Sequence, residues 1–385
     1  MVLKYFSYYM NKDNKQNRTN VLAASNKIDY ICEALIGCGY DVHIVSASGT
    51  SNKKGIYPGY TVKLKDQKYL QTFPTVPWRN CIQKILQLFF VRTGIFFSLM
   101  QVKKREHVLV YHSLGYMNIV KFAHKLKKFH LILEVEEIYA DVIGDKKLRE
   151  KELEFLQSAD SYIFPTQLLD EIVNVNKKPV VIIHGTYQVE IDRECKIFSK
   201  SMQDTSDKII HCVYAGTLDP RKGGGAAAAA AEFLPSNYHL HVLGFGSEED
   251  VSKMKDFVSK ISRISKAKVT YDGVLSGDDY IKFIQSCDIG LSTQDPTAAF
   301  NGTSFPSKIL SYLANGLRVV SIKIPAIEQS AVDDMLYYYT KQTPEEIAKA
   351  IQSVKFDDDY NSRKRIAELA SAFEKDFKKL LESYK

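Results

Sequence analysis

Apolar runs and amphipathic segments alternate along both halves of the chain and predict two α/β domains. In the first half, short apolar runs with strand character are separated by segments whose apolar residues recur at helical spacing. This order is typical of a doubly wound parallel sheet. The predicted strands are Leu3–Tyr9, Asp41–Ala47, His107–His112, Leu131–Val135, Ser161–Phe164 and Val180–Ile183, and the predicted helices are Asn20–Gly37, Asn118–Lys128 and Leu148–Gln157.

A polar stretch, Asp192–Lys208, interrupts this alternation and is the predicted linker. The alternation then restarts, and 385 residues are more than one hydrophobic core usually supports. We therefore predict two Rossmann-like domains. The second half has predicted strands at Ile209–Ala215, Tyr238–Leu243, Val269–Tyr271, Ile289–Ser292 and Val319–Ile322, and predicted helices at Gly224–Phe233, Glu248–Ser262, Asp278–Ser286, Ser307–Asn315 and Asn361–Lys385.

The composition is that of an ordinary globular protein, with 45% hydrophobic and 25% charged residues. Its six cysteines are scattered, without a CxxC pair or a Cys/His cluster along the chain. This spacing indicates reduced thiols and argues against a structural zinc site. The first ten residues lack the layout of a signal peptide, so a cytoplasmic location is expected.

Charge is distributed unevenly. Residues 1–130 contain 20 Lys and Arg against 6 Asp and Glu, whereas the rest contains 32 against 39. Such a basic half favours anionic lipid, nucleic acid or a phosphate-linked substrate, and a merely solubilising face is the alternative. Because the chain has no RNP, zinc-finger or helix-turn-helix signature, we expect no nucleic-acid partner.

The segment Ile82–Met100 is rich in Ile, Leu and Phe, and the cations Lys103, Lys104 and Arg105 follow it. Lys84 and Arg92 make it a poor membrane-spanning helix. An interfacial helix on an anionic leaflet fits the apolar residues and the cations, and a helix buried in the first domain fits nearly as well.

The stretch from residue 301 to 322 predicts a loop, an amphipathic helix and an apolar strand. Gly316 lies where a helix end needs a left-handed residue. Lys308 lies in the first helical turn, where a cation is unfavourable unless an anion is nearby. This placement indicates a phosphate-bearing ligand, and the alternative is an ordinary unit with Lys308 in solvent.

Two further glycine turns follow strands in the second half. One strand ends at Gly216, and Arg221 and Lys222 precede three glycines that begin a helix; the other turn is Leu243–Gly246. Glycine lets the backbone approach an anion closely, and cations there can neutralise a diphosphate. Neither a Walker A motif nor GxGxxG is present, and a Gly-rich turn with solvated cations is the alternative. Because such turns meet at the carboxyl edge of a parallel sheet, they predict a nucleotide-type ligand.

Four segments carry a resemblance to a known family: VYAGTLDPRKGG, HLHVLGFGSEED, VTYDGVLSGDDYIKFIQSCDIGLS and FPSKILSYLANGLRVVS, which together span about residues 209–322. In order and spacing they resemble GT-B fold glycosyltransferases, similar to the large retaining family 4 of bacterial surface-polysaccharide assembly. The resemblance implies an α/β, GT-B fold with two Rossmann-like domains facing each other across a cleft. Residues 1–195 would hold the acceptor, residues 361–385 would pack back on that domain, and residues 205–360 would hold the sugar nucleotide.

The resemblance also implies roles for particular residues. Donor binding would involve the strand-end, loop and helix residues Gly216, Arg221, Lys222, Gly244, Gly246, Thr303, Ser304, Phe305, Lys308 and Ser311. His112 would lie near the donor sugar, and the alternative is a strand-end histidine with a structural hydrogen bond. Neither a metal nor another cofactor is expected. The sequence departs from the family at Thr303 and Ser311, where most members have glutamates, and at Met10–Asn20, which replaces a Gly-Gly loop.

Glu134, Glu136 and Glu137 end a predicted strand on the side where the acceptor is expected. A carboxylate there, with Glu136 as the candidate, can orient or deprotonate an acceptor hydroxyl. The alternative is a solvated strand-end acid.

Together these features predict a glycosyltransferase, hexosyltransferase-like and retaining, with a nucleoside-diphosphate sugar as donor. Its acceptor would be a carbohydrate or a polyprenyl-linked (lipid-linked) glycan in surface polysaccharide or glycoconjugate synthesis. We expect it in the cytoplasm, peripheral on the anionic inner face of the plasma membrane. The alternative is a non-catalytic GT-B subunit that binds a partner protein or a glycan.

Overall fold

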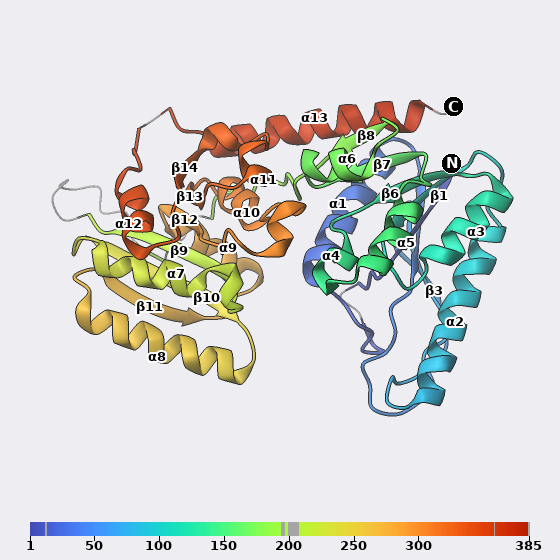
Figure 1. The fold of residues 1–385 in the computed structure, drawn as a ribbon, viewed down its shortest axis with the longest axis horizontal. Coiled ribbons are helices and arrows are strands. Elements are labelled where there is room, and N and C mark those ends of the chain that lie inside the picture. Colours follow the sequence, from blue (N-terminus) through green and yellow to red (C-terminus); the bar gives the residue numbers. More distant parts are fainter. Residues whose placement is uncertain (12–13, 194–196, 199–207, 358, 384–385) are drawn as a thin grey trace. The chain divides into compact units, whose positions relative to one another are not determined.

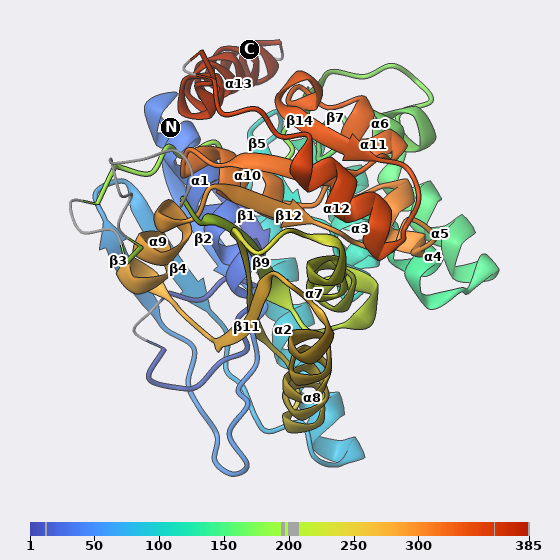
Figure 2. The same ribbon diagram turned by 90° about the vertical axis from the view of Figure 1, so that its left-hand side faces the viewer.

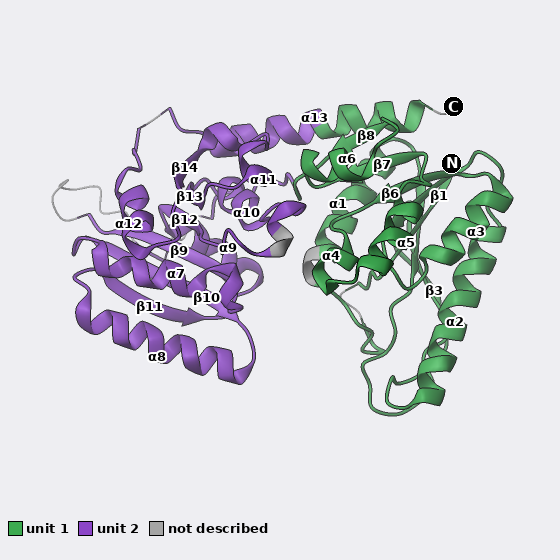
Figure 3. Ribbon diagram, in the orientation of Figure 1, with its two compact units in different colours: residues 1–186, 373–385 green, residues 187–372 purple. Residues whose placement is uncertain are grey.

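The computed structural model describes residues 1–385 except 12–13, 194–196, 199–207, 358 and 384–385 (Figure 1). The chain forms two compact units, coloured separately in Figure 3. Unit 1 comprises Met1–Thr186 and Phe373–Lys385, and unit 2 comprises Tyr187–Ala372.

Unit 1 is built on an eight-stranded sheet with the order β3-β4-β2-β1-β5-β6-β7-β8. All neighbouring strands pair in parallel except β3 and β4, which form an antiparallel pair at one edge. The strands are β1 (Val2–Ser7), β2 (Asp41–Ser46), β3 (Thr61–Lys65), β4 (Lys68–Thr72), β5 (His107–Tyr111), β6 (His130–Glu134), β7 (Ser161–Phe164) and β8 (Val180–Ile182). Every residue of β6 and β7 is buried, as expected of strands covered on both faces.

The helices of unit 1 are α1 (Leu22–Gly37), α2 (Cys81–Met100), α3 (Met117–Lys127), α4 (Tyr139–Ile143), α5 (Lys146–Leu156) and α6 (Gln167–Val173). The six strands predicted for this half are present, whereas the β3–β4 hairpin was missed. Most of β3 is exposed, so its polar residues carry no burial pattern, and its lysines protect a sheet edge from pairing with another chain.

Unit 2 has a six-stranded, fully parallel sheet with the order β11-β10-β9-β12-β13-β14. The five predicted strands are present, and β14 at the edge was missed. The strands are β9 (Ile210–Thr217), β10 (Tyr238–Phe245), β11 (Lys268–Gly273), β12 (Ile289–Ser292), β13 (Arg318–Ile322) and β14 (Leu336–Tyr339).

Helices cover both faces of this sheet. Figure 2 shows α12, α7 and α8 in a row on one side, with α9 and α10 on the other. The helices are α7 (Gly224–Ala230), α8 (Glu248–Ile264), α9 (Gly277–Ser286), α10 (Lys308–Ala314), α11 (Pro325–Glu328), α12 (Pro344–Gln352) and α13 (Ser362–Glu382), with 3-10 turns η1 (Pro220–Lys222), η2 (Ala231–Phe233), η3 (Ala299–Gly302) and η4 (Asp333–Met335). The predicted C-cap residue of α10, Gly316, has a φ of +86°.

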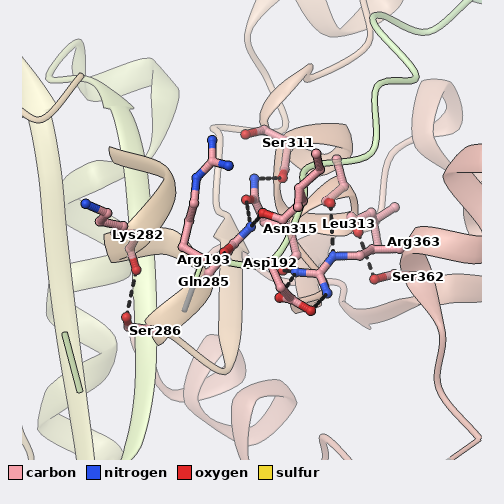
Figure 4. Close-up of polar contacts among 12 residues, drawn as sticks. Asp192, Arg193, Lys282, Gln285, Ser286, Ser311, Leu313, Asn315, Ser362 and Arg363 are labelled. Carbon is pink, nitrogen blue, oxygen red and sulfur yellow. Dashed lines mark hydrogen bonds and ion pairs between the residues drawn. The ribbon is translucent and has the colours of Figure 1, made fainter. Parts of the chain in front are cut away.

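The segment that joins the two units differs from the predicted linker. Much of Asp192–Lys208 lies outside the described residues, but its first two residues are held by unit 2 (Figure 4). The Asp192 carboxylate accepts hydrogen bonds from the Arg363 guanidinium at 2.8 and 2.9 Å, and the Arg193 N–H donates to Gln285 at 2.9 Å. Residues 187–193 therefore belong to unit 2, although the predicted first domain extends to residue 195.

Helix α13 is shared between the two units. Its first turn is tied to unit 2, where the Ser362 hydroxyl donates to the Leu313 carbonyl at 2.8 Å. From Phe373 onward it belongs to unit 1, and the Phe373 ring stacks on Tyr30 of α1 with centroids 5.5 Å apart.

Each sheet reverses its strand order once, between β1 and β5 in unit 1 and between β9 and β12 in unit 2. In open α/β sheets, ligands bind beyond the carboxyl ends of the strands at this reversal. The loops after β9 and β12 in unit 2, and after β1 and β5 in unit 1, are therefore where a site is expected.

Candidate functional site

In unit 2, the loops that follow β9 and β12 touch each other. Gly223, with a φ of +90°, lies so close to the second loop that an added Cβ would be 1.8 Å from the Thr293 carbonyl oxygen. The Thr293 hydroxyl donates to the Gly223 carbonyl at 2.8 Å, and the Asp295 N–H donates to the Arg221 carbonyl at 2.9 Å. Only glycine fits between the two loops in this conformation.

Lys308, the first residue of α10, reaches the end of β9. Its ammonium lies 3.9 Å from the centroid of the Tyr214 ring and 3.4 Å from the Lys222 carbonyl oxygen. A Cβ added to Gly216 would be 3.2 Å from the same nitrogen. The structure thus brings Gly216, Lys222 and Lys308 together from distant parts of the chain.

Lys308 is poorly placed to remain charged. Burial, and secondly the nearby Lys222, lower its pKa to about 7. Two cations in this position repel each other, and a bound anion would relieve that repulsion.

Arg221 is exposed and already has a carboxylate partner. Its guanidinium donates to Asp219 at 2.7 Å, and its N–H donates to the same side chain at 2.9 Å. These hydrogen bonds lower the pKa of Asp219. This partner was not predicted from the sequence. The Asp219–Pro220 pair could have indicated it, because Asp219 caps the short turn η1.

The predicted strand-end glycines Gly244 and Gly246 lie beside the end of β9. Gly244 pairs with Gly216, and a Cβ at Gly244 would be 2.6 Å from the Gly216 carbonyl oxygen. A Cβ at Gly246 would be 2.9 Å from the Asp250 Cβ. The predicted strand end at Leu243 is wrong, because β10 extends to Phe245 and places Gly244 within the strand.

The loop before α10 contains Thr303, Ser304 and Phe305. Thr303 and Ser304 are half-buried, and Phe305 is buried. Ser311 lies on α10 with its hydroxyl 3.4 Å from that of Tyr280, a residue that the sequence analysis did not single out. The two positions at which the family has glutamates therefore hold small hydroxyl side chains here.

In unit 1, His112 directly follows β5 and is 1% exposed. Its Nε2 lies 2.6 Å from Glu152 Oε1, and Glu152 also accepts hydrogen bonds from the N–H groups of Tyr139 and Ala140, each at 2.8 Å. Burial raises the pKa of Glu152, but these hydrogen bonds outweigh it and the pKa is lowered. His112 Nδ1 is buried without a hydrogen-bond partner among the described residues.

Glu136 forms an ion pair with Lys27 of α1. Its neighbour Glu134, the last residue of β6, is fully buried and accepts a hydrogen bond from the Tyr5 hydroxyl. Burial is the main reason that the pKa of Glu134 is raised to about 7.

A cavity of about 590 Å³ lies in unit 1. Its walls come from residues after β1, β2, β4 and β5 and from one side of α2. Trp78 lines it and is 57% exposed, and the cations Lys53, Arg79 and Arg92 line it as well. This lining of an aromatic ring and cations was not predicted from the sequence, although Trp78 is the one tryptophan of the chain.

Helix α2 is present as predicted, and its apolar side chains divide between buried and exposed positions. Ile95 and Leu99 are fully buried, and the side-chain amide oxygen of Gln87 accepts from the Val76 N–H at 3.0 Å and from the Thr75 hydroxyl at 2.8 Å. Other apolar side chains face solvent, with Ile82, Ile85, Phe89 and Phe97 between 58% and 72% exposed. The helix is long and apolar enough to cross a membrane, a test that core helices of soluble proteins also pass.

Potential metal ligands also meet in unit 2. The sequence shows no Cys/His cluster, but the fold brings His211, His239 and His241 together. These histidines were not predicted as a cluster, because they are spread over two strands, β9 and β10, that are separated in the sequence.

No model of a known protein family matches the chain, and a search of curated proteins finds no match. Solved structures do match over almost the whole length. HepE from Anabaena in complex with UDP has a TM-score of 0.65 at 12% identity, covering 100% of both chains. An α,α-trehalose-phosphate synthase (UDP-forming) from Burkholderia xenovorans in complex with glucose-6-phosphate has a TM-score of 0.65 at 10% identity, covering 99% of each chain. An E. coli structure described as trehalose-6-phosphate bound with UDP-2-fluoro glucose has a TM-score of 0.67 at 10% identity, covering 100% of this chain and 98% of that one.

At these identities the likeness concerns the fold. It confirms the predicted α/β, GT-B fold with two Rossmann-like domains.

Proposed function

We propose that the chain is a glycosyltransferase that moves a sugar from a nucleoside-diphosphate donor to a carbohydrate or lipid-linked acceptor. The observation that carries this proposal is the meeting of Gly216, Lys222 and Lys308 at the strand-order reversal of unit 2. The GT-B fold supports it, because similarly folded proteins have been solved with UDP, UDP with glucose, and UDP-2-fluoro glucose.

The donor diphosphate would bind beside Lys222 and Lys308. Since the pKa of Lys308 is lowered to about 7 in the free protein, a phosphate would favour its charged form and gain a charge-assisted hydrogen bond. Arg221 is exposed and can exchange Asp219 for a phosphate oxygen. Gly216 carries no side chain that would crowd the Lys308 ammonium, since an added Cβ would lie 3.2 Å from that nitrogen.

Catalysis would rest on stabilising the departing diphosphate electrostatically. In a retaining reaction, the bond from the anomeric carbon to the phosphate oxygen breaks, and the acceptor oxygen bonds to that carbon from the same face. The leaving phosphate takes the acceptor's proton, so no enzyme nucleophile and no metal is required. His112 is proposed to lie near the donor sugar, and Glu136, fixed by Lys27, to orient the acceptor hydroxyl.

The cavity of unit 1 is the proposed acceptor site. Trp78 offers an aromatic face for a sugar ring, and Lys53, Arg79 and Arg92 favour an acceptor that carries phosphate. A polyprenyl-phosphate-linked glycan has both features. Leu88 and Val91 of α2 line the same cavity, so the lipid part of such an acceptor could lie along this helix.

Helix α2 would also hold the protein peripherally on the anionic inner face of the plasma membrane. Its exposed Ile, Leu and Phe side chains would enter the interface, and the surrounding cations would contact acidic headgroups. A cytoplasmic role in surface polysaccharide or glycoconjugate synthesis follows from this acceptor and this location.

A donor screen tests the activity. The full chain is incubated with uridine, guanosine and other nucleoside-diphosphate sugars, with and without polyprenyl-phosphate acceptors, and products are identified by mass. We expect one donor to be hydrolysed or transferred, and expect Lys222→Ala to lose that turnover. Lys253→Ala is the matched control, because this exposed lysine of α8 pairs with the exposed Glu249 one helical turn away. If no donor reacts and Lys222→Ala leaves diphosphate affinity unchanged, the proposal is wrong.

The second candidate is a non-catalytic GT-B subunit that binds a partner protein or a glycan. It is favoured by Thr303 and Ser311, which replace the family's two glutamates. Calorimetry separates the two candidates, because a degenerate subunit should bind neither uridine diphosphate nor guanosine diphosphate.

A further inference from the structure

Three histidines of unit 2 lie on one face of two neighbouring strands. His211 is in β9 and pairs with His239 of β10, and His241 follows two residues later, so all three side chains project to the same side. One ring nitrogen of each lies within 4.8 Å of the other two. Since both strands lie in the middle of a parallel sheet, the backbone fixes this arrangement.

A hydrogen-bond network joins the three rings to β11. His211 Nδ1 lies 3.0 Å from His241 Nε2, and His241 Nδ1 lies 3.1 Å from Asp272 Oδ2. The Thr270 hydroxyl donates to Asp272 at 2.8 Å and lies 3.0 Å from His239 Nε2.

This network determines which nitrogens keep a lone pair. Because the Thr270 hydroxyl gives its proton to Asp272, it accepts from His239 Nε2–H and leaves a lone pair on His239 Nδ1. Because Asp272 accepts from His241 Nδ1–H, the lone pair of His241 is on Nε2, directed at His211. A carboxylate behind a histidine in this way is the usual outer partner of a metal ligand.

Aromatic rings partly shield the imidazoles from solvent. Phe198 stacks on His211 with centroids 4.1 Å apart, and Phe283 packs edge-on against His241 at 5.1 Å. His239 and His241 are buried, whereas His211 is half-buried.

We propose that His211, His239 and His241 bind one divalent transition-metal ion, with Zn²⁺ as the best match, and that Asp272 orients His241. Neutral imidazoles suit Zn²⁺, and bonds of about 2.0–2.1 Å in a tetrahedral site place neighbouring nitrogens about 3.3 Å apart. The distance of 3.0 Å between His211 Nδ1 and His241 Nε2 is close to this separation. The ion would therefore replace the proton of the hydrogen bond between these two nitrogens.

This site is separate from the donor site. The histidines lie in the amino-terminal halves of β9 and β10, whereas Gly216 and Gly244 lie near the carboxyl ends of the same strands. The ion would tie β9 to β10 and, through Asp272, to β11, and would take no part in sugar transfer.

The test is Zn²⁺ binding by the full chain after treatment with a chelator, measured by calorimetry, with Co²⁺ absorption as the report on geometry. We expect one equivalent of Zn²⁺, a higher Tm on binding, and the visible absorption of tetrahedral Co²⁺. His211→Gln should lose this binding, and Asp272→Asn should weaken it about 10–100-fold.

Two controls test whether a loss of Zn²⁺ binding is specific to the three histidines and whether the variant is folded. His43→Gln changes a half-buried histidine of β2 in unit 1 and should bind Zn²⁺ as the wild type does. His211 is the least buried of the three ligands, so His211→Gln is the variant best able to fold, and its circular dichroism without metal checks this. Absence of stoichiometric Zn²⁺ binding by the wild type, or unchanged affinity in a folded His211→Gln chain, would overturn the proposal.

Discussion

At the residue scale, Lys308 is the most informative side chain of the donor region. Its half-buried ammonium lies over the Tyr214 ring and near the Lys222 carbonyl oxygen, and neither contact supplies the negative charge of a carboxylate. Spacing alone placed Lys308 in the first turn of a helix, and the structure confirms that position. Its partners come from β9 and η1, some 90 residues earlier in the chain, which no local pattern shows.

This environment predicts a pH dependence of nucleotide binding. The pKa of Lys308 is about 7 in the free protein and should rise when a diphosphate binds. Affinity for uridine diphosphate should therefore be highest below pH 7 and decrease by up to about tenfold for each pH unit above 7. Calorimetry from pH 6 to 9 measures this slope. Lys308→Met should bind more weakly and show the flatter profile of the nucleotide itself, and an equal slope in both chains would contradict the assignment.

Glu152 provides a second prediction at this scale. Glu152→Ala would leave His112 Nε2 and the N–H groups of Tyr139 and Ala140 buried without their acceptor, so the free energy of unfolding should fall by about 3 kcal/mol or more. Urea denaturation followed by circular dichroism measures it. Glu154→Ala, two residues away, removes an exposed ion pair with Lys121 and should leave the free energy of unfolding close to that of the wild type. Similar losses in both variants would refute the structural role of Glu152.

At the element scale, the loop from β9 to α7 depends on Gly223. An alanine there would meet the Thr293 carbonyl at 1.8 Å and would also have to adopt a φ of +90°. Gly223→Ala should therefore displace the loop and abolish nucleotide binding. Gly225→Ala lies in α7 with its nearest neighbour at 4.0 Å, so it should bind normally and stabilise the helix by up to about 1 kcal/mol. Calorimetry and thermal melting of both variants check this, and normal binding by Gly223→Ala would show that the loop is not part of the site.

Helix α2 gives the second prediction at this scale. Sedimentation with anionic vesicles should capture the chain, and neutral vesicles should not. Ile85→Ser should weaken capture by about tenfold, because burial of one such side chain contributes roughly 1.5–3 kcal/mol. Ile264→Ser at the end of α8 is the matched control, since the two isoleucines are 67% and 62% exposed. Equal capture by both kinds of vesicle, or equal loss in both variants, would exclude α2 as the membrane contact.

At the scale of the whole molecule, the sequence predicted the fold class and most strands, because buried parallel strands are continuous apolar runs such as Leu131–Val135. It missed β3, β4 and β14. β3 and β14 lie at sheet edges, where fewer residues are buried, and β4 forms the hairpin with the exposed strand β3. It found the glycines and cations of the donor region because these follow strands or begin helices. It could not find the Glu152 partner of His112, the cavity beside Trp78 or the three histidines, because each depends on contacts between elements that are distant in the sequence.

The central claim is that a nucleoside diphosphate binds at the strand-order reversal of unit 2, beside Lys222 and Lys308. Calorimetric titration of uridine and guanosine diphosphates into the wild-type chain, Lys222→Ala and Lys253→Ala tests it most directly. We predict saturable binding of at least one nucleotide to the wild type and to Lys253→Ala, and at least tenfold weaker binding to Lys222→Ala. Binding of neither nucleotide to the wild type, or equal affinity in all three chains, would contradict it.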